Sequence, residues 1–491
     1  MTSLETAPAG VPTRRIAIEQ VSRVEGHGKV TLLLDDEGHV QQARLHIVEF
    51  RGFERFIQGR PFWEVPVMVQ RLCGICPVSH HLAASKAMDQ VVGVTQLTPT
   101  ADKVRRLMHY GQMLQSHALH FYYLSTPDLL FGFDSDVAQR NVVGVASAYP
   151  DVAMHGVLLR KFGQEIIRLT AGKRVHGTGS VPGGVNRSVT LAERHALQAE
   201  MPQIIAWAME GVELVKSLHK LHKDLYASFG HFRSSVLSIV GADGRLEFYD
   251  GRLRARDADG KIFLDGVEPH DFRQHIAEEV KPWTYMKFPY LTALGPERGW
   301  YKVGPLARVQ NCDFIHTPLA EAERREFRAA HNGEMVHAPL AYHWARLIEL
   351  LHAAEVIGEM LRDDDLSGDA LMARGDRTGE GVGIIEAPRG TLIHHYRVDE
   401  RDLVTMCNLI VSTTHNNQAM NEGIRQVARR YLDGRKVTAG LLNHIEVAIR
   451  AFDPCLSCAT HALGRMPLIV ELVDAAGERI DRVVRDAGDW C

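Results

Sequence analysis

Several features that mark whole classes of protein are missing from this 491-residue sequence. It contains no uninterrupted run of about 18 apolar residues, the length that a membrane-spanning helix needs. Residues 1–13 are rich in alanine, proline and threonine, and they have neither the basic start nor the apolar core of a secretory signal. We therefore expect a cytoplasmic protein that does not enter the membrane, with a flexible N-terminus over residues 1–13.

A surplus of charge of one sign is missing as well. The chain has 56 basic and 60 acidic residues, a formal net charge of -4, and no block of like charges. Proteins that bind nucleic acid usually carry a basic patch, so we expect no nucleic acid partner. The glycine-rich segment Gly177–Gly184 fits neither G-x-G-x-x-G nor G-x-x-x-x-G-K-[ST], and no apolar strand precedes it. We interpret it as a structural loop, which leaves this chain without a nucleotide site of its own.

Cysteine is also rare, because seven residues in a chain of this length are too few for a disulfide framework. Four of the seven lie in two short motifs, Arg71-Leu72-Cys73-Gly74-Ile75-Cys76 followed by His80, and Asp453-Pro454-Cys455-Leu456-Ser457-Cys458 followed by His461. Cysteines three positions apart can place both thiolates of one turn on a single metal centre. The motifs lie near opposite ends of the chain, so the fold must bring them together to make one four-thiolate site.

Between these motifs the periodicity is mostly helical. Alternating apolar and polar residues predict a small antiparallel sheet over residues 14–50, with Glu25 in its first loop, and a β-meander over residues 244–266. Three long helices are predicted: from Pro99 to Pro127, from the capping box at Thr190 past Leu221 with a kink at Pro202, and from Pro318 to Leu361 with a break near Asn332. Long helices that are not coiled coils pack in bundles. The expected fold class is α+β, mainly α, with a central bundle of long helices and small peripheral antiparallel sheets.

Structural zinc is the first alternative for four cysteines. Zinc half-sites are usually tens of residues apart, whereas these two are at opposite ends of the chain. The ionisable residues of the surrounding segments would have no task at a closed zinc site: Glu25, His80, Arg389, Asp453 and His461. Thiolates are soft ligands that favour nickel, copper(I), zinc and iron, and one sulfur can bridge two metals. The residues therefore favour a redox site in which some sulfurs bridge and others are terminal. We interpret Cys312 and Cys407 as buried small hydrophobic residues.

The sequence resembles the large subunits of nickel-iron hydrogenases. The two cysteine motifs match as Arg71-x-Cys73-Gly74-x-Cys76-x-x-x-His80 and Asp453-Pro454-Cys455-x-x-Cys458-x-x-His461. Three further stretches agree: Arg23-Val24-Glu25-Gly26-His27, Phe50-Arg51-Gly52-Phe53-Glu54 and Glu386-Ala387-Pro388-Arg389-Gly390. The resemblance implies the nickel-iron hydrogenase large-subunit fold, with a catalytic domain over residues 14–461.

This resemblance also implies a set of metals. Nickel would be held by all four cysteines, with Cys73 and Cys455 terminal and Cys76 and Cys458 bridging to an iron that carries cyanide and carbonyl ligands, Fe(CN)2(CO). Glu54 and His461 match the family's ligands to a magnesium (Mg). His80 is expected to hydrogen-bond a bridging sulfur, and Thr413, with Ser412 as the alternative, is expected to hydrogen-bond a cyanide.

The implied reaction is the reversible heterolytic cleavage of H2. Cys455 is the implied base for the proton, Glu25 the next group on its path, and Arg389 the residue that lies over the open site and polarises bound hydrogen. Two of these residues have a simpler interpretation: Glu25 as a loop carboxylate paired with Arg23, and Arg389 as a buried structural arginine in a turn.

One departure from the family pattern concerns an aspartate that commonly shares the canopy over the metals with the arginine. Alignment of the segment that contains His117 and His120 places Phe131 at the expected position, between Asp128 and Asp134. We therefore assign the canopy aspartate to no residue. The other histidines, His394 and His395 among them, are interpreted as surface or satisfied core residues.

The chain continues past His461 to Cys491. Mature family members end at this histidine, so the resemblance implies that residues 462–491 are a C-terminal extension, which a maturation endopeptidase removes after nickel-insertion factors have acted. The simpler interpretation is an ordinary C-terminal element, because Leu468–Val473 is apolar enough for a strand.

The segment Cys455–Gly464 looks most like the soluble NAD-reducing, bidirectional hydrogenases. Electrons have no acceptor in this chain, so the resemblance implies diaphorase subunits that bind FMN and NAD, together with an iron-sulfur (Fe-S) small hydrogenase subunit. The alternatives are a deazaflavin- or NADP-linked hydrogenase, a complex-I-like subunit that shares the fold without the metal site, and a zinc-stabilised binding protein. Retention of all four cysteines speaks against the complex-I-like subunit.

Overall fold

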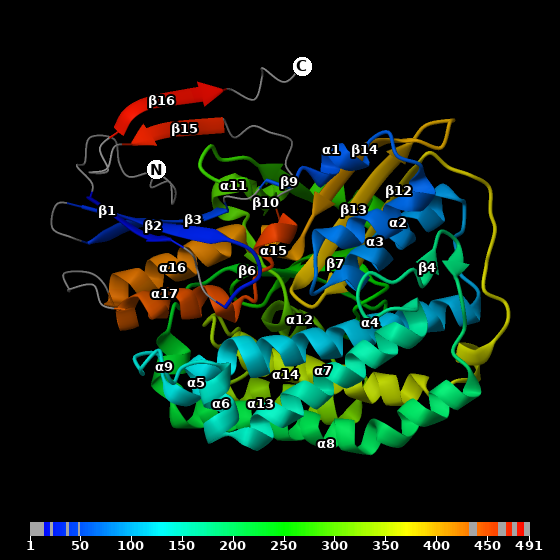
Figure 1. Cartoon of the computed structure of the whole chain (residues 1–491), viewed down its shortest axis with the longest axis horizontal. Coiled ribbons are helices and arrows are strands. Elements are labelled where there is room, and N and C mark those ends of the chain that lie inside the picture. Colours follow the sequence, from blue (N-terminus) through cyan, green and yellow to red (C-terminus); the bar gives the residue numbers. More distant parts are fainter. Residues whose placement is uncertain are drawn as a thin grey trace.

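A computed structural model describes residues 14–19, 23–35, 39–47, 50–431, 439–459, 468–473 and 479–485. The expected flexible N-terminus, His461 and the expected cleavage point after it lie outside these residues. Long helices form one layer of the molecule, and small antiparallel sheets with shorter helices lie against it (Figure 1). The predicted fold class, α+β and mainly α, is confirmed.

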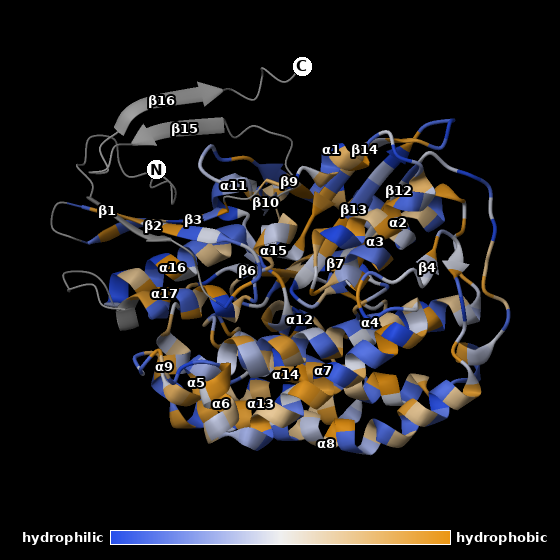
Figure 2. Ribbon diagram, in the orientation of Figure 1, coloured by the Kyte–Doolittle hydropathy of each residue, from blue (hydrophilic) through white to orange (hydrophobic). Residues whose placement is uncertain are grey.

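The helical layer is organised around α14 (Ala341–Met360), which contacts α4 (Pro99–Leu119), α8 (Leu191–Leu221) and α13 (Pro318–Ala330). On its other side α4 packs against α7 (Pro150–Ala171). All but one residue of α14 are buried, as expected of a helix enclosed by neighbours. Apolar residues recur along α7, α8 and α14 (orange in Figure 2).

Two predicted helices differ from the structure at their ends. The first does not stop at Pro127: α4 passes into a π-helical turn, His120–Ser125, and then into α5 (Thr126–Phe131). Pro127 stands in the first turn of α5, where a missing N–H costs no hydrogen bond. The expected break in the third helix is confirmed, since Asn332 and Gly333 adopt positive φ between α13 and α14. The capping box at Thr190 is also present at the start of α8.

Two sheets position the motifs. The predicted N-terminal sheet is confirmed, with strands β1 (Arg14–Glu19), β2 (Gly28–Leu34) and β3 (Val40–Ile47) in that order, and α16 (Asn417–Tyr431) packs on β3. The second sheet has the order β12 (Glu380–Ala387), β13 (Gly390–Val398), β14 (Val404–Ile410), and α3 (Pro77–Val91) covers it. The Cys73 motif lies just before α3, and its Cys76 lines a small cavity together with Pro388 and Arg389 of the turn between β12 and β13.

The predicted β-meander over residues 244–266 is wrong in part. Only the hairpin of β7 (Arg252–Arg256) and β8 (Ile262–Val267) lies in that range, and it joins β6 (Ser235–Val240) and β11 (Tyr301–Lys302) in a four-stranded sheet. Three small hairpins complete the strands: β4 (Ser180–Val181) with β5 (Gly184–Val185), β9 (Ile276–Glu279) with β10 (Phe288–Leu291), and β15 (Leu468–Val473) with β16 (Arg479–Arg485). The remaining helices are α1 (Phe53–Ile57), α2 (Val65–Met68), α6 (Val142–Ala148), α9 (Lys223–Ser228), α10 (Phe272–His275), α11 (Gly295–Arg298), α12 (Pro305–Asn311), α15 (Ser412–His415) and α17 (Ala439–Ala451).

In the part of the chain that the structure describes, no individual helix combines the length and the hydropathy needed to cross a membrane. The pair α6 and α7 meets the criterion only when taken together, and the two helices are bent by 119°.

Buried neutral histidines make the stability of this fold dependent on pH. Burial lowers the pKa of His109 to about 4 and the pKa of His352 and His415 to about 3. Below about pH 6.5 the unfolded chain therefore binds more protons than the folded one, and the free energy of unfolding falls as the pH falls. We expect a loss of about 2 kcal/mol for each of these histidines between about pH 7 and pH 5. Denaturant titrations at both pH values measure it, and His352→Gln should reduce the loss; an unchanged pH dependence would contradict this account.

Candidate metal centre

The two cysteine motifs meet at one buried point. The sulfur atoms of Cys73, Cys76, Cys455 and Cys458 all lie within 4.8 Å of one another, and all four residues are buried. Sγ of Cys73 is 2.8 Å from Sγ of Cys76 and 3.2 Å from Sγ of Cys455, and the latter is 2.8 Å from Sγ of Cys458. Opposite ends of the chain therefore supply one four-sulfur cluster.

Local structure explains how each motif presents its sulfurs. Cys76 precedes the first turn of α3, and the backbone N–H groups of Ile75 and Cys76 donate to Sγ of Cys73 at 3.3 and 3.0 Å. Donors and a helix N-terminus favour a thiolate. Burial raises the pKa of Cys73, but hydrogen bonds from the other three cysteines and the charge of Arg389 outweigh it, so that this pKa lies well below its usual range.

The donor set fits soft metals. Burial raises the pKa of Cys455 and Cys458 well above the usual range, so the protein alone does not stabilise four thiolates together. A soft cation such as nickel or iron would neutralise them. Beside the cluster lies a small cavity of about 10 Å³. Its lining includes apolar Ala387, Pro388, Leu392 and Val411 and the polar Arg389, Ser412 and Thr413. This lining, apolar with a few hydrogen-bond donors, matches the polarity of small diatomic ligands on an iron.

Glu25 reaches the cluster from the loop before β2. Its Oε2 lies 3.0 Å from Sγ of Cys455, and it accepts a hydrogen bond from the backbone N–H of Ser457 at 3.1 Å. The hydroxyl of Ser457 donates to its other oxygen, and the backbone N–H of Leu456 donates to the Glu25 carbonyl at 2.9 Å. The carboxylate is thus fixed on the cysteine motif. Its expected alternative pairing does not occur, because Arg23 pairs with Asp128 instead.

Gly26 allows this close contact. It has φ of 81°, and a Cβ added there would lie 2.6 Å from the backbone nitrogen of Ser457. Gly59 has φ of 80° with no atom within 4 Å of an added Cβ. We expect Gly26→Ala to lower the free energy of unfolding by about 2 kcal/mol more than Gly59→Ala, because only the first substitution adds a steric clash to the backbone strain. Thermal unfolding of both variants measures the difference. Equal losses of unfolding free energy in the two variants would show that Gly26 does not pack tightly against Ser457.

Arg389 stands in the turn between β12 and β13, fully enclosed next to the cluster. Its Nη2 donates to Oδ1 of Asp453 at 2.9 Å and its Nη1 to Oγ of Ser116 at 3.3 Å. Burial opposes the charge, but Asp453 and the cysteines outweigh it and raise the pKa of the guanidinium well above its usual range. The carboxylate beside Arg389 is therefore that of Asp453, two residues before Cys455. The sequence indicated only that Asp453 belongs to the cysteine motif, not that it contacts Arg389.

The other two candidate aspartates lie elsewhere. Asp128 is buried and pairs with Arg23 and with Arg450 at 2.6 Å. The side chain of Asp134 is 74% exposed and faces His444. Neither has a contact with Arg389 among the described hydrogen bonds.

Thr413 and Ser412 both line the cavity. The hydroxyl of Ser412 donates to the carbonyl of Gly390 at 2.7 Å, which uses its hydrogen. The hydroxyl oxygen of Thr413 accepts the N–H of Cys455 at 2.9 Å, which leaves its own hydrogen to be donated into the cavity. Of the two, Thr413 fits a donor to a small ligand better.

His80 also lines the cavity, but its described hydrogen bond goes away from the sulfurs. Its Nδ1 lies 3.1 Å from Nε2 of His394, whose Nδ1 lies 2.7 Å from the hydroxyl of Tyr396. Burial lowers the pKa of His80 to about 4, so the ring is neutral. His394 is buried, as the core interpretation expected, and it orients His80, a role that its sequence context did not indicate.

Glu54 lies in a second polar cluster. Its carboxylate accepts hydrogen bonds from Nζ of Lys287 at 3.1 Å and from the backbone N–H of Leu409 at 2.9 Å, and the same Lys287 contacts Glu278 at 3.2 Å. Burial raises the pKa of Glu54. Two enclosed carboxylates that share one lysine fit a magnesium ion as an additional cation. The other expected ligand, His461, lies outside the described residues.

Comparisons with known proteins point to the same chemistry. A family model described as nickel-dependent hydrogenase matches residues 51–135 and 248–461, and one described as HoxL-like matches residues 15–50. The chain is 50% identical over 488 residues to the NAD-reducing hydrogenase HoxS subunit beta of Cupriavidus necator, covering 96% of this chain and 100% of the relative. It is 42% identical over 477 residues to an F420-non-reducing hydrogenase subunit of Methanothermobacter thermautotrophicus, with coverage of 96% and 100%. A crystal structure of an NAD+-reducing nickel-iron hydrogenase in the H2-reduced state matches with a TM-score of 0.90 and 59% identity, over 91% of this chain and 100% of the other.

Proposed function

Because the chain belongs to the nickel-dependent hydrogenase family, we propose that it is the catalytic subunit of a nickel-iron hydrogenase that cleaves H2 reversibly and passes the electrons to NAD+. The observation that carries this proposal is the buried four-sulfur cluster with the carboxylate of Glu25 against Cys455. The acceptor is inferred from the NAD-reducing relative and the NAD+-reducing structure.

We assign the metal centre to Cys73, Cys76, Cys455 and Cys458: all four would hold the nickel, and Cys76 and Cys458 would also hold Fe(CN)2(CO). When bound, these metals supply the Lewis acidity and redox chemistry that split H2 heterolytically. Cys455 takes the proton and passes it to Glu25, whose carboxylate is 3.0 Å away. Cys455 is 1% exposed whereas Glu25 is half-buried, so this transfer moves the proton toward solvent.

The remaining site residues act by orientation and charge. Arg389, held by Asp453, places a fixed positive charge and an unpaired Nε–H beside the cavity, where it polarises bound hydrogen. Thr413, which lines the cavity, would donate its hydroxyl to a cyanide. His80 acts as a neutral hydrogen-bond partner of a bridging sulfur, oriented by His394 and Tyr396. Glu54 and His461 would bind the magnesium.

Electrons leave where the Cys73 motif meets the surface. Gly74 is exposed, and no atom lies within 4 Å of a Cβ added there, so a partner can approach the cluster. We assign this partner as an iron-sulfur small subunit, followed by diaphorase subunits with FMN and NAD sites. We assign the complex to the cytoplasm, where NAD+ is available as the acceptor. The catalytic domain comprises residues 14–461, and a maturation endopeptidase removes residues 462–491 after nickel-insertion factors have loaded the site.

Metal analysis and infrared spectroscopy of the assembled complex test the proposal. We expect nickel and iron near one each per chain, infrared bands of cyanide and carbonyl, and H2-dependent reduction of NAD+ in preference to NADP+ or a deazaflavin. Zinc as the only metal would refute the hydrogenase assignment. Nickel and iron with a preference for a deazaflavin would retain it and replace the acceptor.

A further inference from the structure

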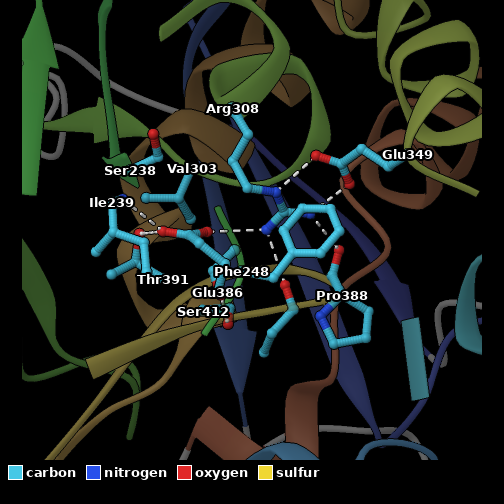
Figure 3. Close-up of polar contacts among 12 residues, drawn as sticks. Ser238, Ile239, Phe248, Val303, Arg308, Glu349, Glu386, Pro388, Thr391 and Ser412 are labelled. Carbon is cyan, nitrogen blue, oxygen red and sulfur yellow. Dashed lines mark hydrogen bonds and ion pairs between the residues drawn. The ribbon is translucent and has the colours of Figure 1, made fainter. Parts of the chain in front are cut away.

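Arg308 on α12 contacts the turn that carries Arg389, because its guanidinium donates hydrogen bonds to the carbonyls of Ala387 and Pro388 (Pro388 is labelled in Figure 3). We propose that Arg308 is a positioning residue, which fixes the direction of Arg389 over the metal centre by holding the two carbonyl groups that precede it. This inference rests on the proposed function, because it concerns the arginine assigned to the canopy of the site.

The turn needs support from outside the sheet. Ala387 pairs with Gly390, so only Pro388 and Arg389 connect β12 to β13. Two-residue hairpins favour turn types with positive φ, because these match the twist of the strands. Neither Pro388 nor Arg389 has positive φ. The strands therefore do not stabilise this turn fully, and contacts with other elements determine its shape.

Arg308 supplies these contacts. Its Nη1 donates to the carbonyl of Ala387 at 2.8 Å and its Nη2 to the carbonyl of Pro388 at 3.2 Å. The two backbones also approach closely here, since a Cβ added at Gly304 would lie 2.8 Å from the carbonyl oxygen of Arg389. The start of α12 thus packs against the residue that it positions.

Two carboxylates hold Arg308 itself in place, on opposite sides of the guanidinium (Figure 3). Glu349 on α14 accepts from Nε and Nη2 at 2.6 Å each, and Glu386 accepts from Nη1 at 2.9 Å. Together with the two carbonyls they use all five N–H donors of the side chain. The turn is thereby tied to α14, the helix at the centre of the helical layer.

A buried arginine with carboxylate partners can serve stability alone, and Arg105 is such a case in this chain. It is fully buried, pairs with both oxygens of Asp89, and donates to the carbonyls of Val181 and Gly184 in the small hairpin of β4 and β5. Arg308 differs because its carbonyl partners immediately precede Arg389. Arg389 has only two described side-chain partners, and its Nε has none, so its direction depends on its backbone.

A double-mutant cycle in the assembled, metal-containing enzyme tests the inference. We expect Arg308→Lys, which has fewer donors and no fork, to retain nickel, to shift the cyanide bands in the infrared spectrum, and to lower H2/D2O exchange about 100-fold, because small displacements of catalytic groups cost about this much. In an Arg389→Lys background, Arg308→Lys should change exchange by no more than about twofold. Arg105→Lys is the matched control, with exchange and cyanide bands like the parent.

A second variant keeps the test valid if Arg308→Lys fails to fold. Glu349→Gln keeps the shape of the anchor but removes its charge, and we expect about a tenfold loss of exchange, again absent in the Arg389→Lys background. Equal losses in both backgrounds would overturn the positioning role and leave the proposed function intact. If both variants lost nickel while Arg105→Lys retained it, Arg308 would be required for the fold and the positioning role would also fall. A parent enzyme without exchange would instead refute the proposed function.

Discussion

Replacing Cys455 by alanine is expected to abolish both H2 turnover and the retention of nickel. Sγ of Cys455 lies within the cluster, 3.2 Å from the sulfur of Cys73 and 2.8 Å from that of Cys458. The substitution leaves three sulfurs for two metals, and it also removes the group that faces Glu25. Elemental analysis of the purified complex, with H2-dependent reduction of an artificial electron acceptor, measures both effects.

Cys312→Ala is the matched control for this experiment. Cys312 is 1% exposed, like Cys455, but it does not belong to the four-sulfur cluster, and its sulfur donates to the carbonyl of Val309 at 3.6 Å. Its truncation should cost about 1 kcal/mol of stability, as for other small losses of buried volume, and should leave nickel content and turnover like the parent. A Cys455→Ala enzyme that retained nickel and turned over would remove Cys455 from the ligand set.

The sequence predicts those parts of the site in which the ligands lie a few residues apart in one motif. Cys73 with Cys76 and Cys455 with Cys458 are recognisable because one turn of chain must present two sulfurs to one centre. Glu25 could be predicted as a presented side chain because it stands in a loop between two alternating strands. Helical periodicity likewise predicts α4, α8 and the broken pair α13 and α14.

The parts that were missed are contacts between residues far apart in the sequence. Arg308 and Glu349 are ordinary helical residues in their own segments, and only the tertiary fold shows that they share a buried network with Glu386. The same holds for His394, whose contact with His80 crosses from β13 to α3. One miss had a usable signal: α7 begins with Pro150 and ends before Gly172, which has positive φ, the usual start and stop residues of a helix. The role of Asp453 had no separate signal, because nothing in a sequence shows which arginine a carboxylate will face.

Glu25→Gln is expected to retain nickel and iron and to lower H2/D2O exchange by about 10²- to 10⁴-fold, the usual contribution of a positioned acid or base. Glutamine has nearly the shape of glutamate, so it can still accept the N–H of Ser457. It cannot take a proton from Cys455, which is the role that we propose for Glu25. Mass spectrometry of HD and D2 formed from H2 in D2O, with metal analysis of the same sample, separates a lost proton path from a lost metal site.

The control for Glu25→Gln is the same substitution at a buried glutamate that has a structural role. Glu355 is 8% exposed and accepts the backbone N–H groups of Leu319 and Ala320 at 2.9 Å each, at the start of α13. Glu355→Gln should lower stability without changing exchange, because removal of its charge affects a helix end and not the cluster. Exchange in Glu25→Gln equal to that of the parent would take Glu25 off the proton path.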